Sequence, residues 1–154
     1  MSADRKKWLR RFIPLLLLLG VASWAEGKIV FIASKSVAPT VAYRSTLPPQ
    51  KGDYVNFQFS HEFIGGGTHT LTKRYRCGPG DTLRTENLMF YCNNEFLGQA
   101  KAQRRDGTPF SHFVWNGAIP PGKAFLWGEH PDSFDSRYWG FMDIKQLERV
   151  VPIL

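Results

Sequence analysis

Apolar and polar residues alternate in the middle of the chain. In residues 53–59, three large apolar residues alternate with Asn56 and Gln58. A period of two is typical of a β-strand with one buried face. Residues 68–75, rich in β-branched and aromatic side chains, predict a second strand. The three glycines of residues 65–67 separate the two strands, so a turn is expected between them.

Shorter strands are expected in the second half of the chain. Asn93 and Asn94 lie between two apolar runs and predict a hairpin with a tight turn. No long amphipathic helix alternates with the strands, so the pattern favours a mainly β domain over an α/β domain. The further strands are predicted at residues 88–91, 95–97, 110–115, 123–127 and 149–153, with one helical turn at 143–147.

The N-terminus has a different pattern. Residues 12–24 form an apolar run that is shorter than the roughly 20 residues of a membrane-spanning helix. Two interpretations fit. The run is the core of a signal peptide cleaved after Ala25, or it is an uncleaved anchor that extends to Ile32. Both divide the chain into a basic tip with a hydrophobic segment (residues 1–32) and a domain outside the cytoplasm (residues 33–154).

Charge supports this orientation. The formal net charge is +7, and residues 1–11 contribute +4 of it, from five Lys and Arg residues against Asp4. Basic residues in front of an apolar run hold that end of the chain in the cytoplasm. No helical stripe of Lys and Arg follows, so we expect no nucleic-acid partner.

Cysteine and histidine positions limit the chemistry. Cys77 and Cys92 are fifteen positions apart, which allows a disulfide across a hairpin or two buried thiols. The four histidines show no metal-ligand spacing, and there is no Cys-x-x-Cys pair. We therefore expect neither a metal nor a cofactor.

Serine chemistry is the remaining option. A serine hydroxyl needs a base to become a nucleophile, and no Ser-His-Asp motif is recognisable. A lysine can replace the histidine if burial keeps it neutral. Three segments carry the relevant residues: Ser-Lys-Ser-Val-Ala-Pro-Thr at 34–40, Lys-Arg-Tyr-Arg-Cys-Gly-Pro-Gly-Asp at 73–81, and Gly-Glu-His-Pro-Asp-Ser-Phe-Asp-Ser-Arg-Tyr-Trp-Gly at 128–140.

In this order, behind a basic and apolar N-terminus, the segments resemble the type I signal peptidase (S26) family. The resemblance implies an antiparallel signal-peptidase/LexA-like β domain and a membrane-associated protein, which favours the anchor interpretation. It also implies a role for each matching residue: Ser36 as nucleophile, Lys73 as general base, Ser34 as oxyanion donor, Ser133 as the residue that orients the lysine, and Asp135 and Arg137 as a structural ion pair.

Within the family, the chain looks most like the small TraF-type peptidases of conjugative transfer. Cys77 inside the lysine segment suggests this subgroup, and the short interval between Asp81 and Gly128 excludes a large inserted domain. The chain departs from the family at Val37, where Met is usual, and at Glu129, where Asp is usual. Neither change removes a catalytic side chain.

The resemblance implies a serine endopeptidase at the bacterial inner membrane, with its catalytic domain in the periplasm. Its partner would be an exported precursor such as a pilin, processed by hydrolysis or closed into a ring. Two alternatives are general removal of leader peptides from exported proteins, and a non-catalytic, membrane-tethered assembly protein on the same scaffold.

Overall fold

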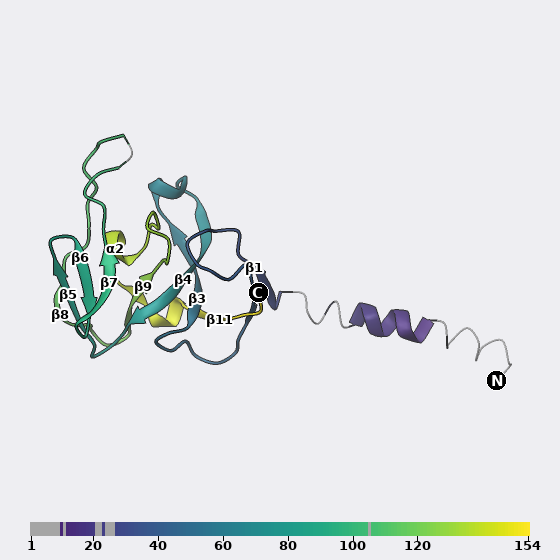
Figure 1. Cartoon of the computed structure of the whole chain (residues 1–154). Coiled ribbons are helices and arrows are strands. Elements are labelled where there is room, and N and C mark those ends of the chain that lie inside the picture. Colours follow the sequence, from purple (N-terminus) through teal and green to yellow (C-terminus); the bar gives the residue numbers. More distant parts are fainter. Residues whose placement is uncertain (1–9, 11, 21–22, 24–26, 105) are drawn as a thin grey trace.

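A computed structural model describes residues 10, 12–20, 23, 27–104 and 106–154. Two antiparallel sheets form the body of the protein and lie side by side in Figure 1. The larger sheet has seven strands in the order β1-β2-β11-β3-β4-β9-β10. Its strands are β1 (Ile29–Phe31), β2 (Val41–Arg44), β3 (Tyr54–Ser60), β4 (Thr68–Cys77), β9 (Lys123–Trp127), β10 (Met142–Asp143) and β11 (Glu148–Pro152).

The smaller sheet has four strands in the order β7-β6-β5-β8. They are β5 (Thr82–Glu86), β6 (Met89–Cys92), β7 (Glu95–Gln99) and β8 (Asn116–Ala118). Three short helices complete these elements: η1 (Glu62–Ile64), α2 (Ser136–Trp139) and η2 (Ile144–Gln146). The described body is therefore mainly β, as the alternating pattern predicts.

One cluster of buried side chains spans the two sheets. Phe125 of β9 stacks on Phe90 of β6 with ring centroids 5.5 Å apart, and both are fully buried. In the same cluster, a disulfide joins Cys77 at the end of β4 to Cys92 at the end of β6. The two cysteines thus connect strands of different sheets and do not close a single hairpin, because β5 lies between them in the chain.

Several predicted elements are confirmed. The Asn93-Asn94 turn joins β6 to β7, and both residues have positive φ (48° and 68°), as a tight hairpin turn requires. The turn predicted at 143–147 is the 3-10 helix η2. Asn56, expected on a polar face, is only 1% exposed, and its Oδ1 accepts a hydrogen bond from the Thr72 hydroxyl of the adjacent strand.

The strand predicted at residues 110–115 is wrong. These residues form no strand, and β8 begins only at Asn116. Their aromatic side chains give the segment a strand-like composition, but they pack against residues of other segments. The Phe113 ring lies 5.0 Å from Phe141, and the Phe110 ring lies 4.3 Å from Tyr138.

The described N-terminal residues 10, 12–20 and 23 are helical. No helix within the described ranges is long and apolar enough to cross a membrane. Most of the basic tip and Trp24, Ala25 and Glu26 of the expected cleavage region lie outside the described residues.

Candidate active site

Lys73 lies on the core-facing side of β4. It pairs in register with Val55 of β3, which is fully buried, and shares its face of the strand with Leu71 and Tyr75. Only 3% of Lys73 is exposed. A strand register that places apolar neighbours on this face therefore also buries the lysine.

This burial changes the acid–base chemistry of Lys73. Removal from water disfavours the charged ammonium and lowers the pKa of Lys73 from 10.5 to about 8. The negative charge of Asp135 acts in the opposite direction, and the positive charge of Arg137 adds to the lowering. Lys73 Nζ donates a hydrogen bond to Ser133 Oγ at 2.8 Å. A substantial fraction of the amine is thus neutral near physiological pH and is held in one orientation.

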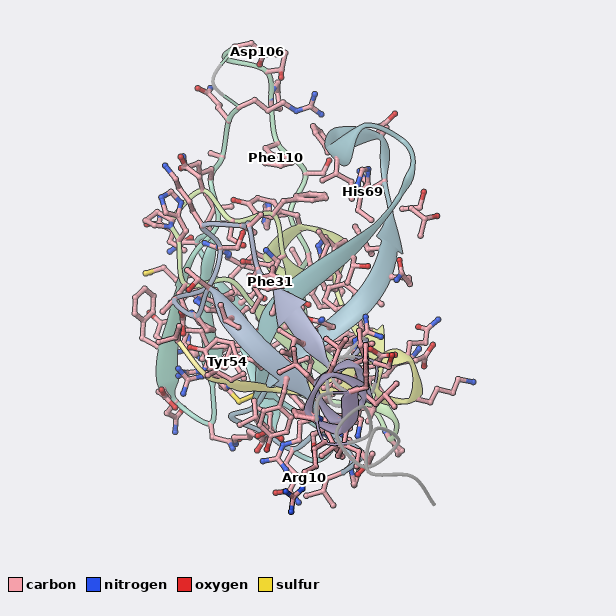
Figure 2. The ribbon with its side chains drawn as sticks, turned by 90° about the vertical axis from the view of Figure 1, so that its right-hand side faces the viewer. Arg10, Phe31, Tyr54, His69, Asp106 and Phe110 are labelled. Atoms are coloured by element: carbon pink, nitrogen blue, oxygen red, sulfur yellow. A yellow bond between two sulfur atoms is a disulfide. The ribbon has the colours of Figure 1, made fainter. Side chains whose placement is uncertain are left out.

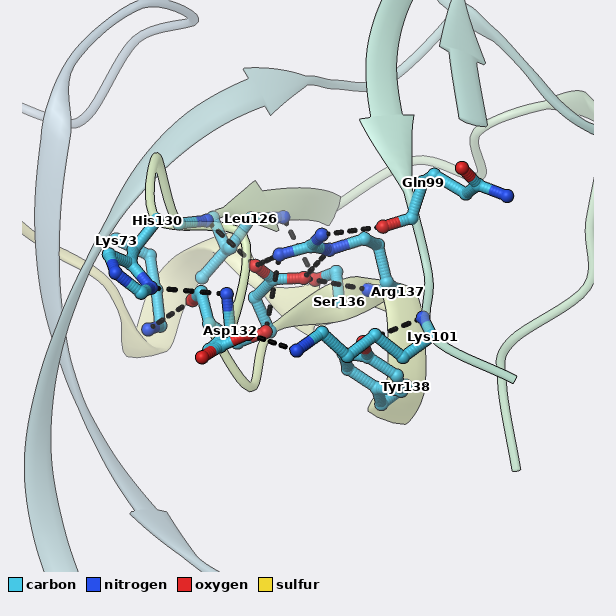
Figure 3. A network of polar contacts seen from close by, with 12 residues as sticks. Lys73, Gln99, Lys101, Leu126, His130, Asp132, Ser136, Arg137 and Tyr138 are labelled. Carbon is cyan, nitrogen blue, oxygen red and sulfur yellow. Dashed lines mark hydrogen bonds and ion pairs between the residues drawn. The ribbon is translucent and has the colours of Figure 1, made fainter. Parts of the chain in front are cut away.

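Asp135 and Arg137 form a buried ion pair next to this lysine (Figure 3). Two parallel hydrogen bonds of 2.8 and 2.7 Å join the guanidinium to the carboxylate, and both residues are at most 1% exposed. Arg137 also donates to the carbonyls of Gln99 and Ser133 and lies 4.0 Å from the Trp127 ring centroid. The pair therefore fixes the backbone that carries Ser133.

The rest of the 128–140 segment supports the same geometry. Asp135 Oδ2 accepts the Gly128 N–H at 2.9 Å, and Ser136 Oγ accepts the Leu126 N–H of β9 at 2.9 Å. A Cβ at Gly128 would lie 1.8 Å from Ser133 Oγ, so no larger residue fits here without displacing Ser133. Ser136 was not among the predicted site residues, although its place between Asp135 and Arg137 was a signal for it.

Ser34 and Ser36 are also brought together. The Ser36 N–H donates to Ser34 Oγ at 3.1 Å. These are the two groups expected to hold the oxyanion, and here they contact each other. The Ser36 carbonyl accepts the Glu129 N–H at 2.6 Å. This hydrogen bond attaches the loop between β1 and β2, which we call the serine loop, to the segment that carries Ser133.

Glu129 clamps the serine loop to the large sheet. Its carboxylate accepts the Ala38 N–H at 2.7 Å, the Tyr54 hydroxyl at 2.7 Å and the Arg74 guanidinium at 3.1 Å. Burial alone would raise the pKa of Glu129, but the hydrogen bonds from Tyr54 and Ala38 and the charge of Arg74 outweigh it and lower the pKa. Sequence reasoning missed Tyr54 and Arg74 as site residues, because 75 and 55 positions separate them from Glu129.

A groove of about 540 Å³ lies beside these residues. Lys73 and Ser34 both line it, together with residues 29–33, Arg44 and residues 70–72. The edge strand β1 and the middle of β4 thus border an open channel next to the buried amine.

The predicted residues form two groups at this site. One contains Ser34 and Ser36, and the other contains Lys73, Ser133, Asp135 and Arg137. Within the described ranges, Ser36 Oγ and Lys73 Nζ share no hydrogen bond, and Glu129 connects the two groups through the backbone. Catalytic hydrogen bonds are often absent before substrate binds, so this separation does not disqualify the pair.

One group of potential metal ligands occurs among the described residues: Cys77, Asp81 and Cys92. Both sulfurs are committed to the disulfide, so the group offers no thiolate for a metal.

Comparison with known proteins adds the family. A family profile described as signal peptidase, peptidase S26, matches residues 5–152. Among solved structures, the chain is similar to a signal peptidase I from Enterococcus faecalis, with 25% identity and a TM-score of 0.45. That match covers 70% of this chain and 99% of the other. No curated protein sequence matches the chain. The profile covers nearly the whole sequence, and the chain therefore belongs to the S26 family of signal peptidases.

Proposed function

We propose that the chain is a serine endopeptidase in which Ser36 is the nucleophile and Lys73 the general base. The observation that carries the proposal is the buried Lys73 amine, which donates to Ser133 and whose pKa is lowered to about 8. A structural lysine gains nothing from such a site, because burying its charge costs free energy. A general base gains a neutral amine near the working pH.

Catalysis begins with a precursor chain in the groove. Its residues before the cut lie as an added strand beside the residues that line the groove. Neutral Lys73 Nζ takes the hydroxyl proton of Ser36, and Ser36 Oγ attacks the scissile carbonyl carbon. The Ser36 N–H and the Ser34 hydroxyl, already 3.1 Å apart, donate to the oxyanion in place of their contact with each other.

Collapse of the tetrahedral intermediate breaks the peptide C–N bond. Lys73 passes its proton to the leaving amine, and the acyl group stays on Ser36 as an ester. Lys73 Nζ then takes a proton from a water molecule, and the water oxygen attacks the ester carbonyl carbon. The bond from that carbon to Ser36 Oγ breaks, Lys73 Nζ returns the proton to Ser36 Oγ, and the product leaves as the acid. Ser133 keeps the amine oriented through both steps.

Covalent labelling tests the dyad. A β-lactam-type acylating inhibitor should label Ser36, and Ser36→Ala and Lys73→Ala should each abolish labelling and precursor processing, with losses on the order of 10³-fold or more. Lys73→Arg should fail equally, since a guanidinium cannot deprotonate to act as a base. Labelling at another residue, or near-normal turnover by either alanine variant, would reject the assignment.

We further propose that the substrate is a pilin precursor of a conjugative transfer system, processed outside the cytoplasm at the inner membrane. Two features support a TraF-type role. Cys77 lies four residues after Lys73, and the described part of the interval from Asp81 to Gly128 holds the small four-stranded sheet, its loops and β9 of the large sheet, which leaves no room for a large inserted domain. A pilin gene beside this one, and cleavage of that pilin by the purified chain, would support the proposal. Cleavage of unrelated leader peptides at equal rates would favour general leader removal.

A further inference from the structure

A second hollow borders Ser133, the hydrogen-bond partner of Lys73. Four aromatic side chains line it, and its volume is about 490 Å³. We call it the aromatic pocket; its rings are Phe63, Phe110, Phe134 and Tyr138. Figure 2 shows Phe110 at the base of the loop that carries Asp106 at its tip.

The four rings pack against one another, some stacked and some tilted. The Phe110 and Tyr138 centroids are 4.3 Å apart, and Phe63 lies 5.1 Å from Phe110 and 5.4 Å from Phe134. Arg104 adds a cation 4.0 Å from the Phe63 centroid. Ring packing of this kind holds the walls in place and leaves a mainly apolar hollow open to solvent, with Lys101, Gln103 and Asp132 among its polar lining residues. Phe63 is 39% exposed.

Ser133 connects the aromatic pocket to the active site. It lines the pocket, and its Oγ accepts the hydrogen bond from Lys73 Nζ. Lys73 in turn lines the groove. The groove and the aromatic pocket therefore flank the same pair of residues, and a peptide that passes Lys73 leaves one hollow and enters the other.

We propose that the aromatic pocket binds an aromatic side chain on the leaving-group side of the scissile bond, within the first residues after the cut. The inference rests on the proposed function, which places the residues before the cut in the groove. In a transfer reaction, an acceptor amine replaces water and approaches the acyl carbon from the leaving-group side. The aromatic pocket therefore also selects which amine reacts.

The competition between acyl transfer to an amine and hydrolysis by water measures how well the aromatic pocket binds that amine. The amine nitrogen attacks the acyl carbon, a C–N bond forms, and the bond from that carbon to Ser36 Oγ breaks. The proton lost by the amine passes through Lys73 Nζ to Ser36 Oγ. An amine held in the aromatic pocket therefore competes better with water for the acyl-enzyme.

The experiment uses the full chain in detergent micelles with N-acetyl-Ala-Leu-Ala 4-nitrophenyl ester as acyl donor. Phenylalaninamide and glycinamide are compared as acceptors, and chromatography gives the ratio of transfer to hydrolysis for each. Burial of one phenyl side chain predicts a ratio about tenfold or more higher for phenylalaninamide. Phe110→Ala and Phe63→Ala should each bring the two acceptors to within about threefold. Phe96→Ala is the control, because Phe96 is an exposed ring on β7 of the smaller sheet. It should keep the wild-type preference for phenylalaninamide over glycinamide.

The outcomes separate the two proposals. If wild type releases 4-nitrophenol no faster than Ser36→Ala, the proposed function is rejected and this inference with it. Release that depends on Ser36, with equal transfer to both amines, rejects the inference alone. A membrane role for the pocket is the competing outcome. If Phe110→Ala weakens binding to phosphatidylethanolamine–phosphatidylglycerol vesicles and leaves the acceptor preference unchanged, the leaving-group assignment is wrong.

Discussion

A single side chain, Lys73, sets the pH dependence expected of the proposed reaction. Because only the neutral amine accepts a proton, kcat/KM for acylation should rise with pH around a midpoint near 8. Ser133→Ala should move this midpoint to lower pH, since Ser133 Oγ accepts a hydrogen bond from the ammonium and so stabilises its charged form. Single-turnover acylation measured across pH gives both values.

Ser34→Ala is the matched comparison. Loss of one oxyanion donor should slow acylation by about 10²–10³-fold and leave the midpoint in place. If Ser34→Ala moves the midpoint and Ser133→Ala changes neither rate nor midpoint, the two roles are wrongly assigned.

Gly128 is the second residue on which the site depends. In Gly128→Ala, the new Cβ would lie 1.8 Å from Ser133 Oγ and 2.4 Å from Ser133 Cβ, so Ser133 must move away from Lys73. A displacement on the order of 1 Å should lower the acylation rate about 10²-fold. Gly67→Ala is the control, because its Cβ would meet only His69 Nε2 at 3.6 Å. A normal rate in Gly128→Ala would show that the Lys73–Ser133 contact is dispensable.

At the scale of elements, the serine loop depends on contacts made by distant strands. Glu129 follows β9 and joins the loop at Ala38 to Tyr54 of β3 and Arg74 of β4. Glu129→Ala should release the loop and lower kcat about 10-fold or more, since a misplaced nucleophile costs rate. The acylation midpoint near pH 8 should not move, because Glu129 is absent from the charges that shift Lys73.

Two further variants make this a test of positioning. Tyr54→Phe removes one of the three donors and should show a smaller loss of kcat. Glu86→Ala, at an exposed carboxylate of β5 that pairs with Arg84 in the smaller sheet, should leave kcat unchanged. A changed pH midpoint in Glu129→Ala would assign Glu129 to proton transfer instead.

The same elements show what sequence patterns predict and what they miss. Strands β3, β4 and β9 are long and apolar enough to be recognised from their alternation, and the Asn93-Asn94 turn from its chemistry. β1, β2 and β8 have only three or four residues each, and neighbouring strands decide their conformation. Residues 110–115 carry strand-like side chains, but their rings pack against Tyr138 of α2 and against Phe141.

At the scale of the whole molecule, short motifs pointed to individual residues as candidates but did not predict how these residues are arranged. Burial of Lys73 followed from its place late in β4. The contact of Glu129 with Tyr54 did not, because it depends on the register between β3 and β4 and on the path of the 128–140 segment. The connection of the two sheets by Cys77 and Cys92 depends in the same way on the pairing of β5 with β6.

The whole fold bears a cost for the site, and this cost is measurable. Lys73 has a lower pKa in the folded protein (about 8) than in the unfolded chain (10.5), so the unfolded state binds more protons between these values. The free energy of unfolding must then rise with pH between about 8 and 10.5, and below 8 the full penalty of about 3 kcal/mol applies.

Lys73→Met should therefore be inactive but more stable than wild type at pH 7, by up to about that amount. Denaturant unfolding at pH 7 and pH 10 gives the difference between the two proteins, which should shrink at the higher pH. The exposed Lys35→Met should show no such dependence. A Lys73→Met protein that is no more stable than wild type at pH 7 would mean that the fold carries the buried lysine without penalty, and the argument that Lys73 is retained for catalysis would lose its physical basis.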